Sequence, residues 1–278
     1  MLLMLKLLAT TLLLSSTLFA SSQNKSVEKF LEESFKSNPN IISLKVSVVD
    51  KVAIEELKGW DAVIVKIDAT VKAQPENKVI KQKMIWFTNG TIITKELTDI
   101  NTGSDLKELV APSFKDEYYK KENLIYGNAD AKHKVVIFSD PLCPFCRDFV
   151  PKAIEEMKKE PSKFAIYYFH FPLVSLHPAA LELSLAAIAA ELKGNKDVVQ
   201  NLYKVEIDPK ERDINKILAA FNKEMKTDIK ESDLKSAAVM NQFTHDAEMA
   251  EEMMVKGTPT LFFDGKMDKT KKKYQKAN

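Results

Sequence analysis

The feature that most constrains this 278-residue sequence is the segment FSDPLCPFCRDFVP, which contains its two cysteines, Cys143 and Cys146. The apolar run HKVVIFSD leads into it and is typical of a strand buried on both faces of a sheet. The residues CPFCRDFVPKAIEEMKKE predict a helix that has Pro151 as a kink inside it. The cysteine pair is therefore expected where a buried strand gives way to a helix.

This position favours redox chemistry of the two sulfurs. The first N–H groups of a helix are unpaired and its macrodipole adds partial positive charge, so a thiolate at Cys143 is stabilised. Thiolates in such places attack disulfides. Cys146 follows three residues later, near enough to form a disulfide and reopen it. We expect Cys143 to be the nucleophile and Cys146 the resolving thiol.

The two residues between the cysteines tune this site. Pro144 suits the first turn of a helix, because its missing N–H removes no hydrogen bond there. Phe145 makes the neighbouring surface apolar and offers no hydrogen-bond donor to a thiolate.

Two other uses of the pair are weaker. A zinc site needs four ligands, and the histidines show no ligand spacing; they are His133, His170, His177 and His245. A permanent disulfide that closes a four-residue loop would constrain the unfolded chain only slightly. We therefore expect a dithiol that cycles, with no metal and no other cofactor.

The sequence beyond the pair completes a β-α-β unit and then becomes helical. KFAIYYFHF predicts a second buried strand, and helical segments extend from about Pro178 to Met254. The chain returns to a strand in TPTLFFDGK, where Asp264-Gly265 indicates a turn. This last strand is opened by the dipeptide Thr258-Pro259.

Residues 23–100 predict a smaller α+β unit. Residues 24–37 have apolar side chains at helical spacing, and Asn38-Pro39-Asn40 ends that helix. Three segments rich in β-branched residues follow, and the last predicts a hairpin with a type I′ turn at Asn89-Gly90. Residues 101–122 predict a connecting helix or linker.

Residues 1–22 have the features of a secretory signal peptide: an early lysine, an apolar run and small residues near Ala20–Ser22, where cleavage is expected. An uncleaved anchor is the alternative. The rest of the chain is then exported. Its composition, 45% apolar and 29% charged, is that of a globular protein. A net charge of +2 gives no reason to expect nucleic acid as a partner.

The cysteine segment and the distant KGTPTLFF segment together resemble the thioredoxin fold. The resemblance implies a cis peptide bond at Thr258-Pro259 lying against the cysteine pair. It also implies that the backbone of Thr258 binds a substrate strand that crosses the site. The alternative is an ordinary trans proline at the start of a strand.

The complete arrangement is similar to the periplasmic disulfide isomerases of the DsbC/DsbG type. The similarity is specific at FSDPLCPFC and GTPT, and it is only architectural before residue 123. It implies an α+β protein with three parts: a cystatin-like dimerisation module at 23–100, a linker helix at 101–122, and a thioredoxin-like catalytic domain at 123–278 with a helical insertion at about 176–254.

Two features depart from that family. CPFC is neither a typical isomerase motif nor that of the oxidant DsbA, which has histidine at the position of Phe145. A last strand and a full C-terminal helix are also difficult to fit after FFDGK, where DKTKKKYQK predicts one short helix.

The resemblance implies a periplasmic thiol–disulfide oxidoreductase that isomerises or reduces disulfides in exported proteins. It also implies a homodimer and a membrane redox partner that recycles the dithiol. One alternative is a DsbA-like oxidant. Another is a dimeric holdase chaperone in which the cysteines are incidental.

Several side chains near these motifs allow two interpretations. Asp140 either relays protons or caps the following turn, and the cap is favoured. Arg147 either adds positive potential or points to solvent, and solvent is favoured. Neither His170 nor His177 stands in a pattern with a cysteine that is typical of nucleophilic catalysis. Four methionines close to Thr258 in sequence belong either to the core or to an adaptable peptide-binding surface; they are Met240, Met249, Met253 and Met254.

Overall fold

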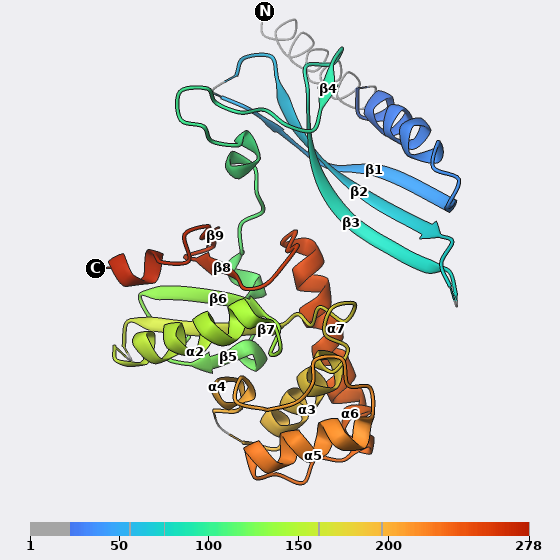
Figure 1. Ribbon diagram of the computed structural model, residues 1–278. Coiled ribbons are helices and arrows are strands. Elements are labelled where there is room, and N and C mark those ends of the chain that lie inside the picture. Colours follow the sequence, from blue (N-terminus) through green and yellow to red (C-terminus); the bar gives the residue numbers. More distant parts are fainter. Residues whose placement is uncertain (1–22, 56, 75, 161, 196, 278) are drawn as a thin grey trace, which may run out of the picture. The chain divides into compact units, whose positions relative to one another are not determined.

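The computed structural model describes residues 23–277 except 56, 75, 161 and 196. The predicted signal peptide at 1–22 lies outside the described residues. The chain divides into two compact units between Ala111 and Pro112 (Figure 1). This boundary falls inside the segment that was predicted to connect the units.

The described residues of the first unit form a helix at 23–36 and an antiparallel four-stranded sheet of order β1-β2-β3-β4. Its strands are β1 (Ile41–Ala53), β2 (Asp61–Val71), β3 (Lys78–Thr88) and β4 (Ile93–Thr94). Val27 and Leu31 of the helix are buried against Val63, Val65 and Trp86 of the sheet. The helical spacing of apolar residues in 24–37 and the alternation in the strands explain this packing.

The hairpin predicted at Asn89-Gly90 forms, but its turn differs from type I′. The loop spans Asn89 to Ile92, and the N–H of Asn89 donates to the carbonyl oxygen of Ile92. Gly90 has a φ of +90°, whereas Asn89 is not among the residues with positive φ. The Asn89 side chain instead accepts hydrogen bonds from the N–H groups of Thr91 and Ile92, which stabilises the longer loop.

The prediction of a helix at 101–122 is wrong. The described residues there contain only short 3₁₀ turns, η1 (Leu106–Leu109), η2 (Asp116–Tyr118) and the start of η3 (Lys121–Asn123). Phe114 is 4% exposed and packs against Phe138, Phe169 and Phe262 of the second unit. Phe114 thus anchors the part of the segment that follows Pro112 to the sheet of its own unit.

The second unit, in the part that is described, contains a five-stranded sheet of order β5-β7-β6-β8-β9. Its strands are β5 (Leu124–Tyr126), β6 (His133–Ser139), β7 (Phe164–His170), β8 (Thr260–Phe263) and β9 (Lys266–Met267). β6 and β7 are parallel and are joined by α2 (Pro144–Lys158), which continues through Pro151. The predicted β-α-β unit is therefore confirmed.

β8 returns antiparallel to β6 and is followed by the short β9. The chain from Lys266 onward therefore supplies a two-residue edge strand and one 3₁₀ turn, η4 (Lys273–Lys276), which lies where a short helix was predicted.

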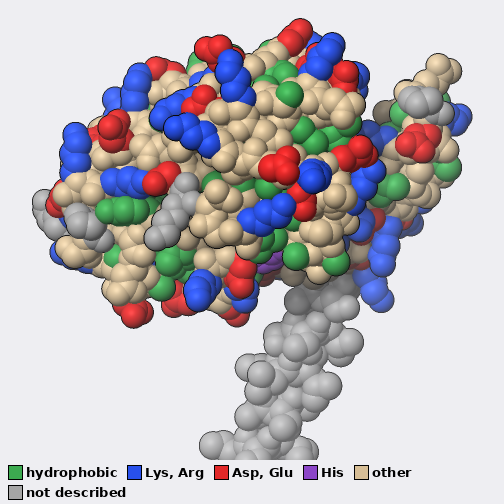
Figure 2. Space-filling model, turned by 90° about the horizontal axis from the view of Figure 1, so that it is seen from below, with side chains coloured by type: hydrophobic (Ala, Val, Ile, Leu, Met, Phe, Trp, Pro, Cys, Tyr) green, Lys and Arg blue, Asp and Glu red, His purple; other side chains and the backbone are tan. Residues whose placement is uncertain are grey.

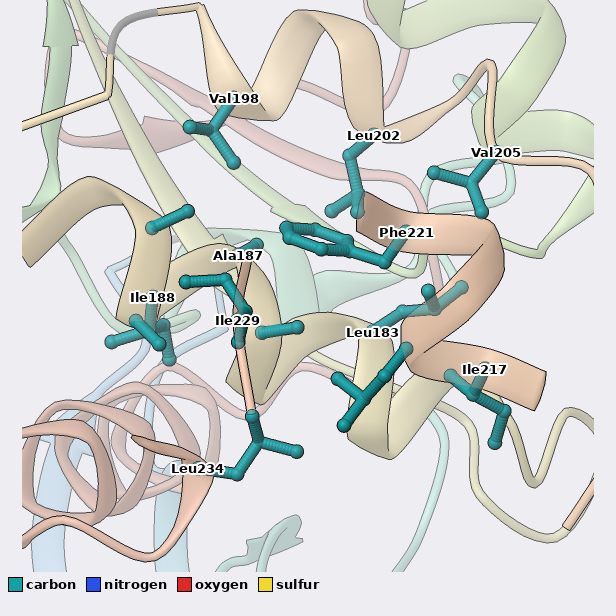
Figure 3. Packing of buried hydrophobic residues seen from close by; sticks show 14 of the residues in the cluster. Leu183, Ala187, Ile188, Val198, Leu202, Val205, Ile217, Phe221, Ile229 and Leu234 are labelled. Atoms are coloured by element: carbon teal, nitrogen blue, oxygen red, sulfur yellow. The ribbon is translucent and has the colours of Figure 1, made fainter. Parts of the chain in front are cut away.

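The helical insertion lies between β7 and β8. It consists of α3 (Ala180–Leu192), α4 (Val198–Leu202), α5 (Ile214–Met225), α6 (Glu231–Leu234) and α7 (Ala237–Glu252). Figure 3 shows its own apolar core, in which Leu183 and Ile188 of α3 face Phe221 and Ile217 of α5.

Helices cover both faces of the second unit's sheet. Val150, Ala153 and Ile154 of α2 pack on one face. Met249 and Met253, at the end of α7, pack with Phe138 and Phe262 on the other. These two methionines therefore belong to the core. β6 and β7 are covered on both faces, as their largely apolar sequences predict.

None of the helices in the described part of the chain is long and apolar enough to cross a membrane. Figure 2 shows basic and acidic side chains interspersed over one face of the protein, in keeping with the balanced composition.

Candidate functional site

Cys143 is the N-cap residue of α2. Its backbone is extended (φ −68°, ψ 123°), and Pro144 occupies the first turn of the helix. The N–H of Arg147 donates to the carbonyl oxygen of Cys143, which closes the first helical hydrogen bond. The thiol of Cys143 therefore lies at the positive end of the helix macrodipole.

The two sulfurs differ in their surroundings. Cys143 is 5% exposed and Cys146 is completely buried. Burial raises the pKa of the Cys146 thiol to about 11, and the hydroxyls of Ser139 and Thr258 oppose this rise. Both cysteines are free thiols. The geometry makes Cys143 the accessible sulfur of the pair, although its exposed area is small.

The distant Thr258-Pro259 segment lies against the pair. Its peptide bond is cis, as the resemblance implied. The thiol of Cys143 contacts the carbonyl oxygen of Thr258 at 3.8 Å. β8 begins directly after Pro259 and pairs with β6, so the sheet itself brings the two segments together.

Phe145 is strongly exposed, at 77%. Val174 and Leu176 are also exposed and belong to the segment that leaves β7. These side chains make apolar surface on the two segments next to Cys143.

Asp140 is completely buried and organises the turn between β6 and α2. Its Oδ1 accepts from the N–H groups of Leu142 and Cys143, at 2.7 and 3.1 Å. Its Oδ2 accepts from the N–H of Leu173 and lies 2.9 Å from Nδ1 of His177. The favoured interpretation of Asp140 as a turn cap agrees with these contacts, but no sequence pattern indicated that His177 would be its partner.

Arg147 does not point to solvent. Its guanidinium donates two hydrogen bonds, of 3.1 and 3.2 Å, to the carbonyl oxygen of Val205. These hydrogen bonds connect the helix of the cysteine pair to the loop after α4.

Sequence reasoning also missed a hydroxyl cluster behind Cys146. The hydroxyl of Tyr203 donates to Ser139 Oγ at 2.7 Å and lies 2.8 Å from the hydroxyl of Tyr168. Tyr203 lies in the insertion, where its apolar neighbours predict only a core position. The one sequence signal for this cluster was the hydroxyl residue Ser139 at the end of β6.

A second buried polar cluster is centred on Asp246. Asp246 of α7 accepts from the N–H of His170 at 2.9 Å and from the side-chain amides of Asn123 and Gln242. Burial raises the pKa of the Asp246 carboxyl to about 6. This cluster connects α7 to β7 and explains why His170 is buried.

A cavity of about 860 Å³ lies between β5, α2 and the α3–α4 region. Its apolar lining includes Ile125, Ile154 and Ile188, and its rim includes Lys158 and Glu191. The cysteine pair is not part of this lining.

The second unit matches a known protein family. Residues 120–277 match the family described as Thioredoxin. The matched region begins before β5 and ends at the end of η4, so it includes the sheet, the cysteine pair and the insertion.

Two kinds of curated relatives match about half of the chain. Na⁺/H⁺ antiporter NhaA 1 of Mycolicibacterium gilvum is 31% identical over 144 residues, which are 51% of this chain and 23% of the relative. The chain thus spans about a quarter of the length of such antiporters. Probable disulfide bond formation protein D of Bacillus cereus is 28% identical over 156 residues, or 51% of this chain and 69% of the relative.

Solved structures match a little more than half of the chain. BdbD of Bacillus subtilis has a TM-score of 0.47 and 20% identity, covering 59% of this chain and 90% of its own. ScsC of Proteus mirabilis in a compact conformation has a TM-score of 0.44 and 19% identity, covering 54% and 73%.

Proposed function

Because the chain belongs to the thioredoxin family, we propose that it is a thiol–disulfide oxidoreductase that works through Cys143 and Cys146. One observation carries the proposal. The accessible sulfur lies at a helix N-terminus and opposite the Thr258 carbonyl, with a second sulfur buried behind it. This is the arrangement that a nucleophile and a resolving thiol require.

In the proposed reaction the Cys143 thiolate attacks a disulfide of the substrate. A mixed disulfide forms, and one substrate sulfur leaves as a thiolate. Cys146 then attacks the Cys143 sulfur, so that the Cys143–Cys146 bond forms and the second substrate sulfur leaves. Two electrons pass from the dithiol to the substrate, and the reverse sequence oxidises a substrate dithiol.

The neighbouring residues have supporting roles in this proposal. Thr258 and Pro259 form the wall that a substrate strand would contact. Pro144 begins the helix whose dipole acts on the thiolate, and Phe145 offers exposed apolar surface to an unfolded substrate.

The substrates are exported proteins that contain cysteine, and the location is the periplasm. A membrane redox partner recycles the pair. These statements are supported by the predicted signal peptide and by the relative described as a probable disulfide bond formation protein. Residues 23–100 serve as the dimerisation module, which is supported by their separate α+β fold.

The direction of exchange has two candidates. Isomerisation or reduction is favoured by Phe145. Its side chain cannot donate a hydrogen bond to the Cys143 thiolate, so the reduced pair lacks one source of stabilisation and gives up its electrons more readily. Oxidation is favoured by the relative whose name refers to disulfide bond formation.

Alkylation of the free thiols in intact cells decides between the two directions. A pair found mostly reduced supports isomerisation or reduction, and a mostly oxidised pair supports oxidation. The oxidoreductase proposal itself is tested by Cys143→Ala, which should abolish exchange with a disulfide-bonded peptide. Retained exchange would refute it, whereas suppression of aggregation by this variant would favour a holdase.

A further inference from the structure

A chain of three buried hydroxyl groups leads to the sulfur of Cys146. Tyr168 lies in β7, Tyr203 directly follows α4, and Ser139 ends β6. The Tyr168 and Tyr203 oxygens are 2.8 Å apart, and the Tyr203 and Ser139 oxygens are 2.7 Å apart. Tyr168, Tyr203 and Cys146 belong to one buried cluster, and the Ser139 side chain acts to lower the pKa of the Cys146 thiol. All four side chains are at most 4% exposed.

The direction of these hydrogen bonds follows from the number of available hydrogens. A hydroxyl group has one hydrogen to donate. Tyr203 uses its hydrogen toward Ser139, so in its contact with Tyr168 it is the acceptor. The hydrogen of Ser139 is then free to point at Cys146. The two tyrosine O–H groups therefore donate in series toward Ser139, and each polarises the next.

This alignment meets a chemical need of the resolving step. Cys146 must lose its proton before it can attack the Cys143–substrate disulfide, because the thiolate is the nucleophile. Burial works against that loss and raises the pKa of the thiol to about 11. The side chains that lower this pKa are hydroxyl groups, of Ser139 and Thr258.

We propose that Tyr203 and Tyr168 are positioning residues for the resolving step, which act through the Ser139 hydroxyl to stabilise negative charge on Cys146. The proposal rests on the proposed thiol–disulfide exchange. The Cys146 proton is released, the Cys146–Cys143 bond forms, and the bond between Cys143 and the substrate breaks. The substrate sulfur departs with the bonding electrons and then takes up a proton.

The insertion therefore has a part in the chemistry of the pair. Tyr203 comes from the insertion, and Arg147 fixes the carbonyl of Val205 two residues later. The loop after α4 is thereby held close to α2, and this contact keeps Tyr203 in place behind Cys146.

The test measures the two steps of exchange separately. Reduced protein is mixed rapidly with glutathione disulfide and quenched with acid, and the Cys143–glutathione adduct is followed by mass spectrometry. Tyr203→Phe preserves the ring and removes the hydroxyl. Adduct formation should keep its rate, while adduct decay should slow by up to about tenfold, as expected when one neutral hydrogen bond behind the Ser139 donor is lost.

The matched control is Tyr126→Phe. The Tyr126 hydroxyl donates to the carbonyl oxygen of Lys158 at 3.2 Å, away from the cysteine pair, so neither rate should change. Tyr168→Phe should slow adduct decay less than Tyr203→Phe, because Tyr168 acts through one more hydroxyl. If Tyr203→Phe does not fold, the rate of adduct decay in Tyr168→Phe tests the inference instead.

The pH profile distinguishes charge stabilisation from a packing effect. Decay in Tyr203→Phe should regain the wild-type rate as the pH is raised, because Cys146 then ionises without help. Equal decay rates in wild type and both variants, or slowing that is equal at every pH, would overturn the inference. Absence of a Cys143 adduct in the wild type would instead refute the proposed function.

Discussion

Oδ2 of Asp140 lies 2.9 Å from Nδ1 of His177, and this contact joins two segments on either side of the cysteine pair. Asp140 follows β6, and His177 precedes the first helix of the insertion. The same buried carboxylate accepts the N–H groups of Leu142, Cys143 and Leu173. One charge therefore holds both the turn before α2 and the segment that leaves β7.

Asp140→Asn should destabilise the protein strongly. The new amide group would face backbone donors, either the N–H groups of Leu142 and Cys143 or the N–H of Leu173, and these buried donors would lose their acceptor. We expect the free energy of unfolding to fall by about 2–4 kcal/mol, measured by urea denaturation. Asp148→Asn is the control, since the Asp148 side chain is 79% exposed, and it should change stability by less than about 0.5 kcal/mol. Equal effects would contradict this role of Asp140.

Cys146→Ala should accumulate mixed disulfides with substrates, and Cys143→Ala should not. In the first variant the accessible sulfur still attacks but nothing resolves the intermediate. In the second the remaining sulfur is fully buried. Non-reducing electrophoresis and mass spectrometry of the purified variants would detect the adducts. The opposite pattern would reverse the roles of the two cysteines.

The chain from residue 23 should form a homodimer through residues 23–100. The reason is that this unit folds separately and contains neither cysteine. Sedimentation equilibrium at tens of micromolar, a range in which ordinary dimers persist, should give twice the monomer mass. A monomer under these conditions would contradict the proposed dimerisation module at residues 23–100.

Phe145→His should make the pair more oxidising. A protonated imidazole would donate a charge-assisted hydrogen bond to the Cys143 thiolate and so stabilise the reduced form. For this couple, about 30 mV corresponds to about 1.4 kcal/mol, so a rise of some tens of millivolts is expected.

Equilibration with glutathione would measure the potential, and Phe145→Leu provides a control that changes shape without adding a donor. The wild-type potential should be more reducing than the value of about −120 mV that is typical of DsbA. A wild-type value at or above it would show that the residue at 145 does not control the potential.

Asp246 should give stability a specific pH dependence. Its folded-state pKa of about 6 exceeds the value of about 3.9 that is typical of an unfolded chain. Between these values the folded state binds more protons than the unfolded state. The free energy of unfolding should therefore fall as pH rises from about 4 to about 6, by an amount on the order of 2 kcal/mol from this group.

Asp246→Asn removes the titrating group and keeps one oxygen acceptor, either for Asn123 and Gln242 together or for the N–H of His170. The difference in stability between wild type and variant, from urea denaturation, should change between pH 4 and 6 and be constant above about pH 7. A difference that stays flat across the whole range would show that Asp246 does not titrate there.

The strands and the helix around the cysteine pair could be predicted because each has a strong local signal. β6 and β7 are continuous apolar runs, and the apolar residues of α2 recur at helical spacing. The positions of Cys143 and of the segment at Thr258-Pro259 follow from where those elements begin and end. Local sequence was sufficient at these places.

The rest depended on contacts between distant segments. Phe114 holds the segment after Pro112 on a sheet, and no local pattern in 101–122 reveals that partner. Tyr203 and Ser139 are 64 positions apart and meet only when the insertion has folded. At Asn89, side-chain hydrogen bonds within the loop override the local preference for a type I′ turn.

The antiparallel pairing of β8 with β6 also determines when the cysteine pair can acquire its surroundings. Thr258 comes 115 positions after Cys143, and synthesis proceeds at about 5–20 residues per second. For several seconds a nascent chain therefore has both thiols without the strand that will cover them. Any oxidant or thiol that meets the chain in this interval encounters two uncovered cysteines, whereas after folding Cys143 is 5% exposed and Cys146 is completely buried.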